Sequence, residues 1–209
     1  MIAAVASVPA PTQLFLLFAQ NAALFAAVAL IAWGAEAAWR ALTGRASAAV
    51  SPLPVCAALS AAGRTIAWVA PVTIALSFGC NLFAQSLGFE LPRQELVLWL
   101  KSGGYSPAVK AGIVIFVLFV APLSEELVFR RFLFRWFSAV MPGVFAALLS
   151  AAAFAVMHGY LAVMVPIMFL GTMFALAYRR TGRLLVPMAM HSAFNALNVV
   201  LVFVCPDLA

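Results

Sequence analysis

Long runs of apolar residues alternate along the chain with short segments that are rich in Gly, Pro and charged residues. An α-helix advances by about 1.5 Å per residue, so about 20 apolar residues are needed to cross the ~30 Å hydrocarbon core of a bilayer. The pattern therefore predicts an all-α fold, a polytopic transmembrane helix bundle of about six spans. The helices are expected at residues 13–39, 55–87, 107–141, 144–157, 161–178 and 184–204.

The segment between the second and third expected helices has a different character. Residues 88–110 combine several charged residues with Gly and Pro around one short apolar piece, Leu96 to Leu100. This piece is too short to span a bilayer, and Trp99 favours a small helix that lies on the membrane surface. We expect it to link an N-terminal two-span region, residues 1–106, to a core of four helices, residues 107–204.

Composition supports a membrane protein and changes how the net charge is interpreted. Hydrophobic residues make up 67% of the chain and charged residues 9%, and the mean hydropathy is +1.12. These values exceed what a soluble core can bury, so the protein is expected to be an integral, multi-pass membrane protein, with the bacterial inner membrane as its location. The formal charge of +6 does not indicate a nucleic-acid partner, because the basic residues are scattered over short loops.

The basic loops predict an orientation in the membrane. Residues 40–64, 130–141 and 179–183 together hold nine of the twelve Lys and Arg residues. The positive-inside rule places these loops on the cytoplasmic side, so both termini are expected to face away from the cytoplasm.

Two adjacent carboxylates, Glu125 and Glu126, follow the apolar run of residues 111–123 after one serine, Ser124. An acidic residue at membrane depth costs roughly 2.5 to 3.5 kcal/mol on insertion scales, so its presence there usually indicates function. Glu126 and Arg130 are four residues apart, a spacing that predicts an ion pair on one helical face. Such a pair reduces the cost of each charge, so it is a structural feature whether or not the site is catalytic.

Helix lengths place the other unusual polar residues at a similar depth. Glu125 lies sixteen residues before the turn near Met141, and His158 lies seventeen residues after it. At about 1.5 Å per residue, both are about 24 to 26 Å from the turn, so they are expected to be neighbours on antiparallel helices. His191 and Asn195 share one helical face and rise to a comparable depth from the turn near Thr181.

These residue types suit hydrolysis of a peptide bond by water. Glu125 and His158 would hold a water molecule between them, with the glutamate as the general base. His191 and Asn195 would donate hydrogen bonds to the oxyanion that forms at the attacked carbonyl. The alternative interpretation of each histidine alone is a hydrogen bond between helices, which is the commoner role of a histidine inside a membrane.

Three short motifs occur in order in the second half of the chain. They read Glu125-Glu126-x-x-x-Arg130, Phe154-x-x-x-His158 and His191-x-x-x-Asn195. Together they resemble the signature of the CPBP intramembrane protease family, also called the Abi family, which contains the type II CAAX prenyl endopeptidases. The resemblance covers about residues 107–204.

The resemblance implies a glutamic intramembrane endopeptidase without a metal or other cofactor. By the same match, Glu125 and His158 activate water, His191 and Asn195 stabilise the oxyanion, Glu126 and Arg130 are supporting residues, and Phe154 shapes the pocket. The implied substrate is a membrane-anchored protein or peptide that is cut near a C-terminal sorting or lipidated tail. The family also includes bacterial members linked to bacteriocin self-immunity.

Two other classes of function fit the same residues. In a zinc-dependent version of the protease, Glu125, His158 and His191 would bind the metal, although the chain contains no HExxH motif. In a non-catalytic version, the polar cluster would stabilise a membrane scaffold or a bacteriocin-immunity protein that binds its partner without cutting it.

Overall fold

The computed structural model describes residues 9–43, 52–89, 95–101, 103–159 and 161–204, and within these ranges it contains helices and no strands. The expected all-α bundle is confirmed. Residues 44–51 of the predicted basic loop 40–64 lie outside the described residues, as does Arg93, and the predicted orientation stays a prediction.

The observed helices follow the expected apolar runs closely. Two long helices, α1 (Pro11–Thr43) and α2 (Val55–Ser86), precede the short α3 (Glu95–Lys101). One continuous helical run then covers residues 107–140, and it is followed by α7 (Gly143–Met157), α8 (Leu161–Thr181) and α9 (Leu185–Val204).

Local sequence explains where these helices begin and end. Ser106 caps the run at residue 107 by accepting a hydrogen bond from the backbone N–H of Val109, and Pro107 occupies the first turn, where its missing N–H is not needed. Gly159 and Gly182 follow the ends of α7 and α8 with φ of 72° and 65°. Glycine adopts this left-handed backbone without the steric penalty of a Cβ, so it stops both helices.

Length and apolarity identify four helices in the described part of the chain that are able to cross a membrane. They are Val55–Ser86, Pro107–Val140, Val163–Thr181 and Leu185–Val204. The helix α7 is apolar but has only 15 residues. The helix α1 has 33 residues, which is enough in length, although several of its side chains lie outside the described residues. The expectation of six spans therefore stays a prediction.

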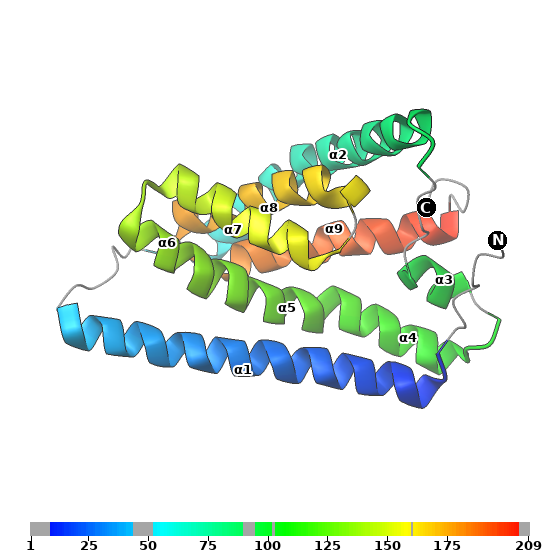
Figure 1. The fold of residues 1–209 in the computed structure, drawn as a ribbon, viewed down its shortest axis with the longest axis horizontal. Helices are drawn as coiled ribbons and strands as arrows, with labels where there is room; N and C mark the ends of the chain where they lie inside the picture. Colours follow the sequence, from blue (N-terminus) through cyan, green and yellow to red (C-terminus); the bar gives the residue numbers. More distant parts are fainter. Residues whose placement is uncertain (1–8, 44–51, 90–94, 102, 160, 205–209) are drawn as a thin grey trace.

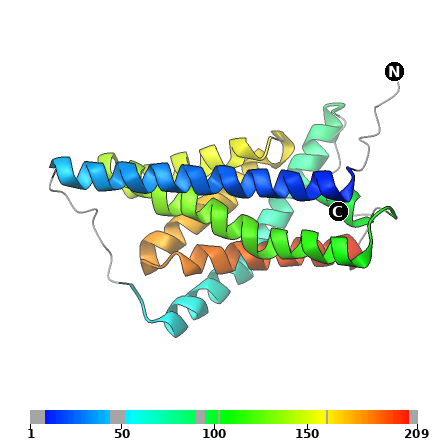
Figure 2. The same cartoon turned by 90° about the horizontal axis from the view of Figure 1, so that it is seen from below.

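The first helix lies along the run of residues 107–140 on one side of the bundle (Figures 1 and 2). Phe18 of α1 stacks on Phe116 with ring centroids 4.1 Å apart. Leu14 is fully buried in a cluster to which α3 contributes Val97 and Leu100. The short helix expected in the linker is thus present, and its apolar side chains pack into the bundle.

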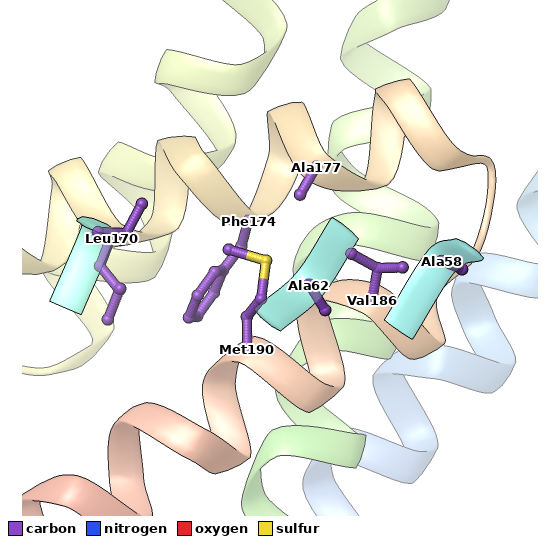
Figure 3. Packing of buried hydrophobic residues seen from close by; sticks show 8 residues of the cluster. Ala58, Ala62, Leu170, Phe174, Ala177, Val186 and Met190 are labelled. Carbon is purple, nitrogen blue, oxygen red and sulfur yellow. The ribbon is translucent and has the colours of Figure 1, made fainter. Parts of the chain in front are cut away.

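The second helix covers the opposite side, where it packs against α8 and α9 (Figure 1). Small residues allow close contact: Ala58 and Ala62 are buried against the two partner helices. Figure 3 shows Phe174 and Met190 side by side in the same cluster. This cluster fixes α8 relative to α9 next to the polar residues described below. The predicted division after residue 106 falls between α3 and the following run, and it stays a prediction.

Candidate active site

The two glutamates lie in the middle of the continuous helical run, between two π-helical segments. The run consists of α4 (Pro107–Ile115), η1 (Phe116–Val120), α5 (Ala121–Glu126), η2 (Leu127–Phe134) and α6 (Arg135–Val140). In a π-helix the hydrogen bonds join residues five apart, and such segments are rare and frequent at functional sites. The segment η2 begins directly after Glu126, so this side chain lies where the helical pitch changes.

Glu126 joins two helices through a single carboxylate oxygen. Its Oε1 accepts a hydrogen bond from Nη1 of Arg130 at 2.9 Å and lies 3.0 Å from Nδ1 of His191 on α9. The side chains of both Glu126 and Arg130 are fully buried. The ion pair predicted from the four-residue spacing is present. A charge pair at this depth is stable only if further hydrogen bonds compensate for the lost water.

Arg130 receives that compensation from α8 and from aromatic rings. Its Nη2 donates a hydrogen bond to the backbone carbonyl of Gly171 at 3.2 Å. Its Cζ lies 4.3 Å from the ring centroid of Phe154 and 5.3 Å from that of Phe174. The negative faces of aromatic rings attract a guanidinium, and the attraction is greatest where water is excluded. Arg130 is therefore held from α7, from α8 and from its own helix.

Glu125 has a different environment from that of its neighbour. Its Oε2 lies 3.7 Å from Nε2 of His191, and its side chain is 17% exposed, whereas that of Glu126 is fully buried. Within the described residues, Oε2 of Glu125, like Oε2 of Glu126, is a buried atom without a hydrogen-bond partner. His191 thus lies between the two carboxylates, with Nδ1 toward Glu126 and Nε2 toward Glu125.

His158 follows the last residue of α7, and its ring turns back toward its own helix. Its Nδ1 lies 2.8 Å from the backbone carbonyl of Phe154. Because a carbonyl only accepts hydrogen bonds, Nδ1 carries a proton, and Nε2 of a neutral ring keeps its lone pair. The ring also contacts the Phe154 ring edge to face, with centroids 4.6 Å apart.

The direct partner of Glu125 differs from the one that helix lengths suggest. Among the described residues its carboxylate approaches His191 and forms no ion pair with His158. The Phe154 ring contacts both imidazoles, because its centroid is 4.6 Å from that of His158 and 5.8 Å from that of His191. Helix lengths set the depth of a residue but leave its direction around the helix axis undetermined, so they do not identify which histidine contacts Glu125.

Asn195 lies one turn after His191 on α9 and reaches the helix that carries the glutamates. Its Nδ2 donates a hydrogen bond to the backbone carbonyl of Val117 at 2.9 Å, within η1. One N–H of the amide is used in this contact, and the second N–H remains as a donor. Asn195 therefore ties α9 to the glutamate-bearing run.

Comparison with known families matches residues 107–197 to the description "Type II CAAX prenyl endopeptidase Rce1-like". Residues 107–197 are thus similar to this family. The match agrees with the resemblance that the three motifs suggest. Comparisons with curated proteins and with solved structures find no match.

The matched segment contains every site residue predicted from the sequence. Since the family is a protease family, the match supports a peptidase that acts on a peptide or protein in the membrane. The spans able to cross a bilayer support an integral membrane protein. The roles assigned to the single residues stay predictions.

Sequence reasoning missed three residues of the matched segment that contact the site. Gly171 accepts the hydrogen bond from Arg130, and the ring of Phe174 lies 5.3 Å from that of His191. Ser150 of α7 donates a hydrogen bond to the carbonyl of Phe129 in η2 at 2.7 Å. Each is a small or apolar residue in an apolar helix, so the sequence carries no signal that separates them from ordinary packing residues.

Proposed function

We propose that this protein is an intramembrane endopeptidase of the bacterial inner membrane that cuts near the C-terminus of a membrane-anchored or lipidated substrate. The observation that carries the proposal is the contrast between the two glutamates. Glu126 is fully buried and fixed through Oε1 by Arg130 and His191, whereas Glu125 is 17% exposed and its Oε2 lies 3.7 Å from His191. Oε2 of each glutamate is buried without a hydrogen-bond partner among the described residues, so the bonds to Oε1 and the exposure separate the two side chains. A carboxylate with a free lone pair beside an imidazole is a suitable general base for water.

Charge balance supports a protonated His191. Two carboxylates and one guanidinium leave one negative charge, and an imidazolium between the carboxylates brings the sum to zero. In that state Nδ1–H donates to Glu126 and Nε2–H faces Glu125 and the space beside it. A low-dielectric site favours a neutral set of charges, because isolated ions lose the solvation that water provides.

The reaction then proceeds in two steps. Glu125 takes a proton from water, the resulting hydroxide forms a C–O bond at the scissile carbonyl, and Nε2–H of His191 and the second N–H of Asn195 donate to the oxyanion. On collapse, the C–N bond breaks and the proton passes from Glu125 to the leaving amine. The lone pair on Nε2 of His158 accepts a hydrogen bond from the attacking water and orients it.

The proposal includes no cofactor. Among the described residues, no three His, Cys, Asp or Glu side chains come together in a group suited to a metal ion. Metal analysis of the purified protein tests the zinc alternative.

The test is a cleavage assay of the purified protein in detergent or nanodiscs. Fluorogenic peptides with C-terminal tails, prenylated and unprenylated, are compared for the wild type, Glu125→Gln and His191→Ala, together with metal analysis. We expect cleavage by the wild type, loss of about 10²-fold or more in kcat for both variants, and no stoichiometric zinc. Unchanged cleavage by Glu125→Gln would refute the glutamic mechanism, and stoichiometric zinc that disappears in His158→Ala would support the metal-dependent one.

A further inference from the structure

The helix α8 passes the buried ion pair at Gly171, where no side chain separates the backbone from its neighbours. A Cβ built at this position would lie 3.1 Å from Nη2 of Arg130 and 3.2 Å from Cδ1 of Phe154. Both distances are shorter than ordinary van der Waals contact. The absence of a side chain at Gly171 therefore provides the space in which the guanidinium and the Phe154 ring lie.

Arg130 has no free direction in which to retreat from such a Cβ. Its side chain is fully buried, Nη1 is bonded to Glu126, and the rings of Phe154 and Phe174 lie 4.3 Å and 5.3 Å from its Cζ. Protein interiors are close-packed, so a displacement of a few tenths of an ångström passes to the neighbouring atoms. The atom that would move first is also the atom bonded to the Gly171 carbonyl.

Gly171 stands at the end of a continuous chain of contacts that leads to the proposed base. The Gly171 carbonyl holds Arg130, Arg130 holds Glu126, and the same oxygen of Glu126 lies 3.0 Å from His191. The other nitrogen of His191 faces Glu125. A shift at Gly171 therefore reaches the imidazole that faces the reacting centre.

We propose that Gly171 is a positioning residue for the reaction: it sets the place of Arg130 and, through Glu126, the orientation of His191 toward Glu125. The inference rests on the proposed function. A misplacement of well under 1 Å in an active site is enough to lower the rate strongly, because reacting groups require close alignment. Since Gly171 has no predicted contact with substrate, the effect belongs in kcat rather than in KM.

Ala151 on α7 is a third neighbour of Gly171, and it allows the positioning role of Gly171 to be tested separately from simple contact between helices. The built Cβ would also lie 3.2 Å from Cβ of Ala151 on α7. Replacing Ala151 by Gly removes this one contact and leaves those with Arg130 and Phe154 in place. If Gly171→Ala acted only through its contact with the Ala151 side chain, the double variant Gly171→Ala, Ala151→Gly would regain full activity.

The first experiment measures kcat, KM and the melting temperature of Gly171→Ala and of this double variant. The matched control is Gly79→Ala in α2, where a new Cβ has nothing within 4 Å. We expect Gly171→Ala to lose about 10-fold or more in kcat with KM within about 2-fold, the double variant to keep the loss, and the control to match the wild type. Full activity of Gly171→Ala, or full rescue by Ala151→Gly, would overturn the proposal.

The second experiment does not depend on activity, so it separates failure of this inference from failure of the proposed function. Melting temperatures are measured for Gly171→Ala, Arg130→Lys and the combination of the two. Lysine lacks the second guanidinium nitrogen that the new Cβ would meet, so Gly171→Ala is expected to lower the melting temperature by less than half as much in the Arg130→Lys background. Additive losses would show that Gly171 and Arg130 are not coupled and would overturn the proposal even in a protein that cleaves. If the melting temperatures show strong coupling between Gly171 and Arg130 but the wild type does not cleave, the inference about Gly171 holds and the protease function is rejected.

Discussion

The helix α2 and the run of residues 107–140 are both long and apolar, but their polar groups are satisfied in different ways. In α2, the hydroxyls of Thr65 and Thr73 donate to carbonyls four residues earlier in the same helix, and Arg64 donates to Ser60. The helix is held in the bundle by small apolar residues such as Ala58 and Ala62. These three side chains thus form their hydrogen bonds within α2.

The glutamate-bearing run depends on three other helices. Among the described residues, α7 donates from Ser150 to Phe129, α8 accepts from Arg130 at Gly171, and α9 contacts Glu126 through His191. Polar bonds between helices require accurate placement, because a donor that is displaced leaves a buried group unpaired. Polar contacts between helices are thus concentrated around the glutamate-bearing run, where the proposed chemistry needs fixed geometry.

The largest difference between the two regions is expected for Arg130→Met. This change keeps most of the side-chain volume but removes the guanidinium and leaves two buried carboxylates against His191 alone, so the free energy of unfolding should fall by about 3 to 5 kcal/mol. Reversible unfolding in mixed micelles measures the change. The neighbouring Arg131→Met, which removes a half-buried side chain, is the control. A loss of less than about 1 kcal/mol for Arg130→Met would show that the pair is not required for stability.

A smaller effect is expected for Ser150→Ala. The substitution removes the hydrogen bond that Ser150 donates to Phe129 in η2, at a cost of about 1 to 2 kcal/mol, because a buried carbonyl loses its partner. Activity should fall together with stability, since η2 carries Arg130. If Ser150→Ala kept the stability and the kcat of the wild type, the π-helical segment η2 would not need this contact.

The smallest effect is expected for Thr73→Val in α2. Thr73 is as deeply buried as Ser150, but its hydroxyl donates within its own helix, to the carbonyl of Val69. That carbonyl keeps its place in the helical ladder after the change, so stability should stay within about 0.5 kcal/mol and kcat should not change. If Thr73→Val lowered the free energy of unfolding as much as Ser150→Ala, the contrast between α2 and the run of residues 107–140 would be lost.

The sequence predicts the features of this molecule that depend on local spacing. Apolar runs give the helices, and the four-residue spacing gives the pair of Glu126 with Arg130. Helix lengths also bring His158 and His191 to one region, since both rings contact Phe154. These predictions succeed because helical rise and periodicity are nearly independent of the rest of the fold.

The features that the sequence does not predict depend on direction around the helix axes. The π-helical segments next to Glu125 and Glu126 change the pitch, so a count of residues no longer gives the face on which a side chain lies. As a result, His191 rather than His158 directly faces Glu125. Gly171 is missed for a related reason: a glycine in an apolar helix does not identify the side chain that fills its space.

The central claim is that two adjacent glutamates have separate roles, with Glu125 as the base and Glu126 as the group that holds Arg130 and His191. Measuring kcat and the free energy of unfolding for Glu125→Gln and Glu126→Gln side by side tests this claim most directly. We predict that Glu125→Gln loses at least about 10²-fold in kcat and keeps its stability within about 1 kcal/mol, because its carboxylate is the less buried and makes no hydrogen bond to the described residues. We predict that Glu126→Gln loses about 3 kcal/mol or more, because Arg130 is left as a buried charge. Equal losses of both quantities in the two variants would contradict the division.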